Sequence, residues 1–192
     1  QLRSREEFLK LGGPQGRGSN SGDLFIKSVN WKPIITAPHG YVLGLAFGII
    51  LESDLIVAEE GTRIQLTETS RGLGGSKYWR LMQYRGGSTL STEIALTGRF
   101  FTAEEGHNAG IIDRVAPKGK HLEAALELAQ QINNNPPLSV RATVRTRRLE
   151  MERIGREAQS QLNALKLFLT EDFHEAAKAF TEKRKPNEFK GR

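Results

Sequence analysis

The sequence of 192 residues contains no cysteine. This absence excludes disulfides, thiol nucleophiles and sites in which cysteine holds zinc or an iron–sulfur cluster. It is compatible with a reducing compartment, and we expect a cytoplasmic protein, with the mitochondrial matrix as the alternative. No two histidines stand at metal-ligand spacing, so no metal site is expected. They are His39, His107, His121 and His174.

Long apolar runs are also absent. The longest, Leu43–Leu51, is interrupted by Gly44 and Gly48 and is far shorter than the roughly 18 residues that a membrane span needs. We therefore expect no membrane segment. The first ten residues are charged, which argues against a signal peptide. A first residue of Gln1 suggests that the sequence is not the complete translation product.

Positive charge is present in excess, with a net charge of +6, and it is concentrated late in the chain. Arg141–Arg156 holds six arginines and two glutamates, and Lys183–Arg192 holds five basic residues and one glutamate. Such a pattern suits a partner that carries phosphate, including nucleic acid. A solvated helix face explains the charge equally simply, and on charge alone we favour that interpretation.

The first 120 residues alternate short apolar segments with helical patterns. Residues 1–30 read as a short helix followed by a glycine-rich, flexible segment. Residues 44–52 are apolar on every side and predict a buried helix between two strands. This order favours an α/β fold. The predicted strands are 34–37, 55–58, 64–66 and 111–115.

Helices dominate the rest of the pattern. One is predicted around Tyr78, Leu81 and Met82, and another over 90–96. Thr102 and Glu105 form a capping box that starts a short helix ending at Gly110. From His121 onward the apolar spacing is helical, with a candidate N-cap at Thr170. We therefore expect an α/β core over 1–120 and a helical region over 121–192.

Two places could carry chemistry. Glu68 follows a strand candidate and precedes the turn Gly72–Gly75, where a carboxylate could transfer protons, although such a glutamate is more often a surface residue. The segment Gly40–Gly44 leads into the buried helix, whose unpaired N–H groups could stabilise an oxyanion. A packing role for Gly44 and Gly48 is the simpler alternative.

Four segments, taken together and in order, resemble the crotonase superfamily of enoyl-CoA hydratases and isomerases. They are Lys32–Gly44, Ser53–Ala58, Ala95–Val115 and Phe180–Arg192. The resemblance covers Lys32 to Arg192. We therefore expect the sequence to lack the N-terminal part of the family domain, which supplies a first oxyanion donor.

The resemblance implies a spiral of strand–strand–helix turns with a helical C-terminal region that builds homotrimers or hexamers. It implies an acyl-CoA thioester as substrate, with coenzyme A arriving as part of that substrate and no separate cofactor. The backbone of Gly44 and Leu45 would hold the thioester oxygen, and Glu68 would be the catalytic acid–base. Phe180 and Lys183 would bind coenzyme A.

One departure bears on the reaction. The resemblance places a second glutamate of the hydratases at Gly48, which we assign to the substrate pocket. Glu52, one turn later, is interpreted as structural or solvated. A single carboxylate is enough to move a double bond, so isomerase chemistry is favoured over hydration. A catalytically silent scaffold protein and a nucleic-acid-binding protein are the rival hypotheses, and the arginines lack the interleaved aromatics of a stacking platform.

Overall fold

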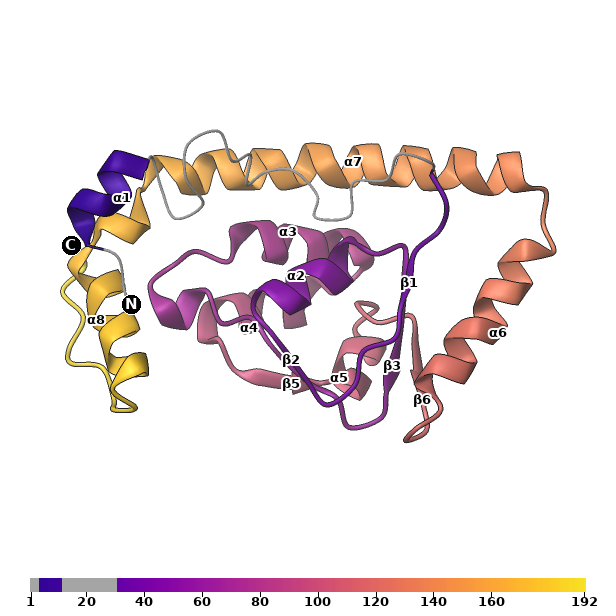
Figure 1. The fold of residues 1–192 in the computed structure, drawn as a ribbon, viewed down its shortest axis with the longest axis horizontal. Coiled ribbons are helices and arrows are strands. Elements are labelled where there is room, and N and C mark those ends of the chain that lie inside the picture. The colour runs from indigo at the N-terminus through magenta and orange to yellow at the C-terminus, as the bar shows by residue number, and fades with distance from the viewer. Residues whose placement is uncertain (1–3, 12–30) are drawn as a thin grey trace.

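The computed structural model describes residues 4–11 and 31–192. Helix α1 (Arg5–Leu11) confirms the short N-terminal helix, whereas the predicted flexible segment after it lies outside the described residues. Strands occur only between Ile35 and Ala116 within these ranges, and every later element is helical. Figure 1 shows the α/β part in the middle of the molecule with helices along one side and at both ends.

Three short strands form a parallel sheet. They are β1 (Ile35–Thr36), β3 (Leu55–Glu59) and β6 (Arg114–Ala116), in the order β1-β3-β6. Ile35 pairs with Leu55, and Val57 pairs with Arg114. The sequence predicted β1 and β3 to within one residue, and it predicted β6 with a start three residues too early. Only the middle strand β3 is largely buried, whereas both residues of β1 are half-buried.

A second sheet contains β2 (Tyr41–Leu43), β4 (Arg63–Gln65) and β5 (Phe100–Thr102). Strand β2 is parallel to β4, and β5 is antiparallel to it. The sequence predicted β4 but neither β2 nor β5. Strand β2 runs directly into the apolar segment that predicts the buried helix, and β5 ends at the N-cap Thr102, so in both places the helix signal hides the strand.

Helix α2 (Leu45–Glu52) connects β2 to β3 and supplies much of the core. Phe47 is fully buried and meets Phe101 edge-on at 5.5 Å between ring centroids. The prediction of a helix buried on all sides was wrong at three positions, because Leu45, Ala46 and Ile49 are exposed. Leu45 is 55% exposed and Ile49 is 39% exposed, so α2 keeps one apolar face outside the core.

Three helices follow β4: α3 (Ser76–Arg85), α4 (Ser88–Thr97) and α5 (Ala103–Asn108). The capping box of α5 is confirmed. The Thr102 hydroxyl accepts from the Glu105 N–H at 3.2 Å, and the Glu105 carboxylate accepts from the Thr102 N–H at 2.9 Å. The last residue of the helix is Asn108, and Gly110 closes it in the predicted left-handed conformation, with a φ of +76°.

The C-terminal region consists of α6 (His121–Asn133), α7 (Pro137–Ala164), a short 3-10 turn η2 (Leu167–Leu169) and α8 (Glu171–Thr181). The Thr170 hydroxyl caps α8 by accepting from the Phe173 N–H at 3.1 Å, as predicted. Helix α7 runs along the molecule, with α6 at one end and α8 beside α1 at the other (Figure 1).

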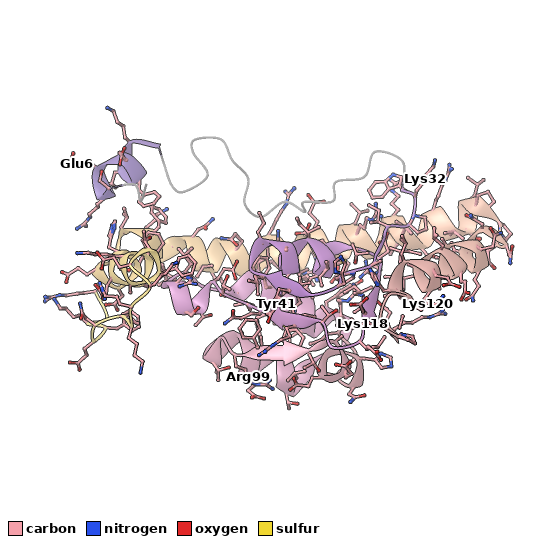
Figure 2. All side chains as sticks on the ribbon, turned by 60° about the horizontal axis from the view of Figure 1, so that its bottom comes forward. Glu6, Lys32, Tyr41, Arg99, Lys118 and Lys120 are labelled. Atoms are coloured by element: carbon pink, nitrogen blue, oxygen red, sulfur yellow. The ribbon has the colours of Figure 1, made fainter. Side chains whose placement is uncertain are left out.

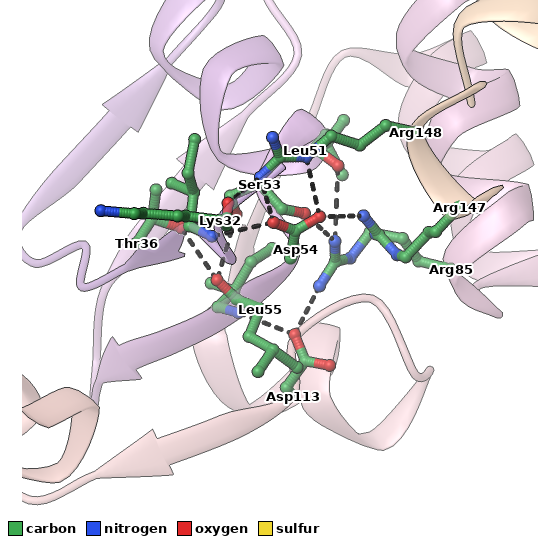
Figure 3. A network of polar contacts seen from close by, with 12 residues as sticks. Lys32, Thr36, Leu51, Ser53, Asp54, Leu55, Arg85, Asp113, Arg147 and Arg148 are labelled. Atoms are coloured by element: carbon green, nitrogen blue, oxygen red, sulfur yellow. Dashed lines mark hydrogen bonds and ion pairs between the residues drawn. The ribbon is translucent and has the colours of Figure 1, made fainter. Parts of the chain in front are cut away.

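Asp54, at the turn between α2 and β3, anchors α7 to the α/β core (Figure 3). Its carboxylate pairs with Arg148, which is 2% exposed, and with Arg147 at 3.1 Å. It also accepts from the Ile34 N–H at 2.8 Å. A charge is rarely buried without a partner because its desolvation is costly, so these contacts fix where α7 lies.

A second ion pair extends this network to α3 and β6. Arg85 donates to the Asp113 carboxylate and to the carbonyl oxygens of Ile111 and Ser53, at 2.7 and 2.9 Å. Asp113 in turn accepts from the Ile56 N–H at 2.7 Å. Burial lowers the pKa of Arg85 to about 10, and Asp113 opposes that shift. Arg85 nevertheless stays charged at neutral pH.

The arginine run of α7 is mostly committed to carboxylates within the chain. Arg147 and Arg148 bind Asp54, Arg153 pairs with Glu150 and Glu157, and Arg156 pairs with Glu152. Outside the C-terminal segment Lys183–Arg192, Arg99 lies well apart from Lys118 and Lys120 (Figure 2). Within that segment, Arg184 pairs with Glu175 and Lys190 pairs with Glu171. The structure therefore favours the structural explanation of this charge over a phosphate-binding one.

Replacing Arg148 by alanine should lower the free energy of unfolding by about 3 kcal/mol, because it removes one partner of a buried charge. The surface pair offers a matched control. Arg153→Ala removes an exposed arginine from the same helix and should change stability little. Denaturant unfolding measures both, and equal effects of the two substitutions would contradict the anchoring role of Asp54.

Candidate active site

Glu68 occupies a tightly bonded turn after β4. Its backbone begins the 3-10 turn η1 (Thr69–Arg71), and its carbonyl accepts from the N–H groups of Arg71 and Leu73 at 3.1 and 2.9 Å. Gly72 closes the turn with a φ of +72°. The predicted place of Glu68, between a strand and a glycine turn, is confirmed.

The Glu68 carboxylate lies over the start of α2. A Cβ atom placed on Gly44 would be 3.3 Å from Glu68 Oε1 and 2.6 Å from Thr67 Oγ1. Gly44 also has a φ of +51°, a conformation that favours glycine. Gly44 therefore lets a carboxylate and a helix N-terminus come together at this point.

The two predicted backbone donors differ in availability. The Gly44 N–H donates to the Gln65 carbonyl at 3.0 Å and so belongs to the pairing of β2 with β4. The Leu45 N–H, the first of α2, has no hydrogen-bond partner in the described part of the chain. Of this predicted pair, Leu45 is the residue that can donate to a ligand, with the positive end of the helix behind it.

Burial raises the pKa of Glu68 above its ordinary value, and hydrogen bonds from the backbone and from Thr67 oppose the shift. Its Oε2 atom is shielded from solvent and has no hydrogen-bond partner among residues 4–11 and 31–192. A carboxyl group in such surroundings accepts and releases a proton closer to neutral pH than an exposed one does. This is the protonation behaviour that acid–base catalysis requires.

Gly48 lies one turn further along α2, under the ring of Tyr78 from α3. The Tyr78 hydroxyl would be 2.9 Å from a Cβ on Gly48. Glu52 is fully buried and pairs with Lys77 at 2.7 Å. Of the two interpretations given for Glu52, the structural one is therefore correct, and its carboxylate is not in water.

These elements enclose a cavity of about 340 Å³. Leu45 and Glu68 line it, and so do Tyr78 and the end of α7. The lining residues from α7 and the turn after it are Gln159, Leu162, Asn163, Lys166, Leu167 and Phe168. Sequence reasoning missed Tyr78 because its spacing marked only the apolar side of a helix, and it missed the α7 residues because nothing in their spacing links them to Glu68.

The two residues predicted to bind coenzyme A lie on or just after α8, outside the lining of this cavity. The Phe180 ring is 62% exposed and sits against the Arg71 guanidinium, with 3.6 Å from that group to the ring centroid. Lys183 is exposed as well. Because Arg71 belongs to the turn that begins at Glu68, Phe180 is linked to the candidate site through a single residue.

A second cavity, of about 550 Å³, lies between β1, α6 and the start of α7. Its lining is mostly apolar and includes Ala125, Leu126 and Ile132. It contains no residue predicted for the site. Over the ranges that the structure describes, no group of three metal-binding side chains gathers, and no helix is long and apolar enough to cross a membrane.

Comparison with known proteins decides the family. The profile of the family described as Enoyl-CoA hydratase/isomerase matches residues 21–192. The chain belongs to this family. The 2,3-dehydroadipyl-CoA hydratase of Escherichia coli (strain K12) is 37% identical to it over 166 residues, which are 84% of this chain and 64% of that protein. Mevalonyl-coenzyme A hydratase sidH of Aspergillus fumigatus is 37% identical over 161 residues, 81% of this chain and 59% of that protein.

Solved structures confirm that this family member has the α/β crotonase fold. A carnitinyl-CoA dehydratase from Mycobacterium avium 104 superimposes with a TM-score of 0.68 at 31% identity, over 84% of this chain and 65% of the other. A methylmalonyl-CoA decarboxylase gives a TM-score of 0.71 at 29% identity, over 84% and 66%. The chain thus spans about three fifths of the length of the two hydratases above.

The raised pKa of Glu68 makes a prediction about stability. The folded chain holds this proton more tightly than the unfolded chain, so the free energy of unfolding falls as pH rises above the ordinary value of 4.5. Glu68→Gln removes that penalty. The variant should be at least as stable as the parent at pH 7, and its advantage should disappear below pH 4.5.

Glu175→Gln is the control, because the pKa of Glu175 is shifted in the opposite direction to that of Glu68. Hydrogen bonds from Arg184 and from the Asn187 backbone lower the pKa of Glu175 to about 2, so its charge stabilises the fold at pH 7 and this variant should be less stable there. Denaturant unfolding between pH 4 and 8 measures both. A Glu68→Gln variant destabilised at pH 7 would contradict the cost of burying the charged carboxylate.

Proposed function

We propose that this chain carries out acid–base chemistry on an acyl-CoA thioester, with Glu68 as its single acid–base. The observation that carries the proposal is the meeting of Glu68 with the unpaired Leu45 N–H at one cavity. A thioester oxygen bound to Leu45 would place the adjacent carbon beside the carboxylate. The names of similar proteins, which are hydratases and dehydratases of CoA thioesters, support the substrate class.

The reaction that needs the fewest groups is a shift of a double bond. Glu68 takes a proton from C2 of a 3-enoyl thioester, and the electron pair delocalises onto the carbonyl oxygen. The Leu45 N–H and the N-terminus of α2 stabilise that negative charge. The proton then returns from Glu68 to C4, which moves the double bond from C3–C4 to C2–C3 without any other reactant.

Isomerase chemistry is favoured because one carboxylate serves it. Glu52, the glutamate at the end of α2, is engaged with Lys77. Hydration is the second candidate, and the names of the relatives favour it. A silent CoA-binding scaffold is the third candidate. It is favoured by Gly48, which stands where the resemblance places a second glutamate of the hydratases.

Assembly into homotrimers or hexamers stays a prediction. Exposed apolar side chains on the C-terminal helices support it, among them Leu122 at 59% and Leu126 at 63% exposure. The cytoplasmic or mitochondrial location and the assignment of Gly48 to the substrate pocket also stay predictions.

The reaction can be identified by mass-resolved product analysis with 2-enoyl-, 3-enoyl- and branched acyl-CoA thioesters. We expect a product of unchanged mass from the 3-enoyl substrate, and we expect Glu68→Gln to lower its rate about 100-fold or more. Glu93→Gln, an exposed glutamate on α4, is the control. Gain of one water would establish a hydratase, and turnover unaffected by Glu68→Gln would remove Glu68 from the mechanism.

Coenzyme A itself provides a second test. If Lys183 contacts a phosphate of this group, Lys183→Ala should weaken its binding about fivefold, with a smaller effect at high salt because exposed charges are screened. Phe180→Ala should weaken binding at any salt concentration, through lost stacking. Lys178→Ala on α8, the helix of Phe180, is the control. Calorimetry at two salt concentrations measures the coenzyme A affinity of all three variants. Equal affinities would exclude both residues from this role.

A further inference from the structure

The Tyr78 ring fills the space above Gly48. A Cβ atom on Gly48 would lie 2.5 Å from Tyr78 Cε1, 2.8 Å from Cζ and 2.9 Å from the hydroxyl oxygen. Non-bonded carbon atoms normally stay about 3.5–4.0 Å apart. The ring therefore takes up the volume that any side chain at position 48 would need, and the two residues fit only as a pair.

This contact lies on the wall of the candidate site. Gly48 is three residues after Leu45, so both face the same side of α2. Tyr78 itself lines the cavity together with Leu45 and Glu68. A thioester held at Leu45 and facing Glu68 would therefore have Tyr78 as its neighbour along α2.

The Tyr78 hydroxyl is a poor candidate for a second base. Burial raises its pKa, and the negative charges of Glu68 and Glu52 raise it further. The phenol stays protonated across the range in which Glu68 titrates. Adding water to a substrate requires room for the water and a group that orients it, and this wall offers an aromatic ring instead.

We propose that Tyr78 determines reaction specificity, because its ring covers Gly48, closes this wall of the cavity to water and leaves Glu68 to return the proton to the substrate. This inference rests on the proposed function. In the double-bond shift, the proton taken from C2 returns to C4. In hydration, a water oxygen bonds to C3 while a proton is added at C2, and that water must stand beside C3. The ring removes the space for it.

The test measures the ratio of hydrated to isomerised product from the same CoA thioesters. Tyr78→Ala opens room for water, at roughly 30 Å³ for each molecule, and should raise this ratio about tenfold. Tyr78→Phe keeps the ring and should retain the parental ratio. Tyr84→Ala removes a tyrosine ring from the same helix, outside the cavity lining, and is the matched control. If Tyr78→Ala does not fold, Tyr78→Leu removes only the far part of the ring.

Two outcomes overturn the inference alone. An unchanged ratio in Tyr78→Ala would show that the ring does not exclude water. A ratio that rises as much in Tyr78→Phe as in Tyr78→Ala would assign the effect to the hydroxyl. Absence of turnover in the parent and in every variant would instead overturn the proposed function, and this inference with it.

A stability measurement tests the packing without any substrate. Gly48→Ala should lower the Tm of the parent by about 4 °C or more, because its methyl group collides with the ring. In the Tyr78→Ala background the same substitution should be tolerated. Additive effects in this double-mutant cycle, found alongside normal isomerisation, would overturn the inference while leaving the proposed function in place.

Discussion

The buried pairing of Asp54 with Arg148 is the interaction on which the arrangement of the molecule depends. It joins the turn after α2 to the middle of α7, and the Arg148 side chain also reaches the Lys32 carbonyl before β1 at 2.8 Å. Replacing such a pair with apolar residues is often harmless, whereas removing one partner is not. The pair therefore acts chiefly by specifying one position for α7.

That position matters for the candidate site some distance away. Helix α7 continues past Arg148 to Gln159 and Leu162, which line the cavity beside Glu68. At about 1.5 Å per residue, these positions lie roughly 20 Å along the helix from the ion pair. A rigid helix anchored at its middle thus sets one wall of a cavity whose opposite wall is the N-terminus of α2.

Much of the fold could be predicted from sequence, because apolar spacing marks buried helix faces and branched strands. The capping box at Thr102 and the N-cap at Thr170 were predicted because their signal is local. Strands β2 and β5 were not predicted, since each runs directly into a helix signal and its pairing is set by distant partners. The exposure of Leu45 and Ile49 was also missed, because apolar residues predict burial without showing what covers them.

The candidate site, like the fold, could be predicted only in part. Glu68 was found through its place between a strand and a turn, and through a resemblance of ordered motifs. The sequence could not reveal that the Gly44 N–H donates to the Gln65 carbonyl while the Leu45 N–H stays available to a ligand. This difference depends on the register of β2 against β4. Nor could it show that Tyr78 packs on Gly48, since the two residues meet only when α3 crosses α2.

The contact between the two ends of the described chain has a consequence for how this protein folds. The ring of Phe8 in α1 lies 5.7 Å from those of both Phe168 and Phe173, so it joins residues at opposite ends of the sequence. Closing the long loop between Phe8 and Phe168 costs only slightly more entropy than closing a loop of moderate length. The contact nevertheless contributes no stabilisation until both partners are in place. It is therefore expected to form late, after α7 has docked, and to open first in local unfolding. The contacts of Phe8 with Phe168 and Phe173 would then form at the end of folding and would not belong to the folding nucleus.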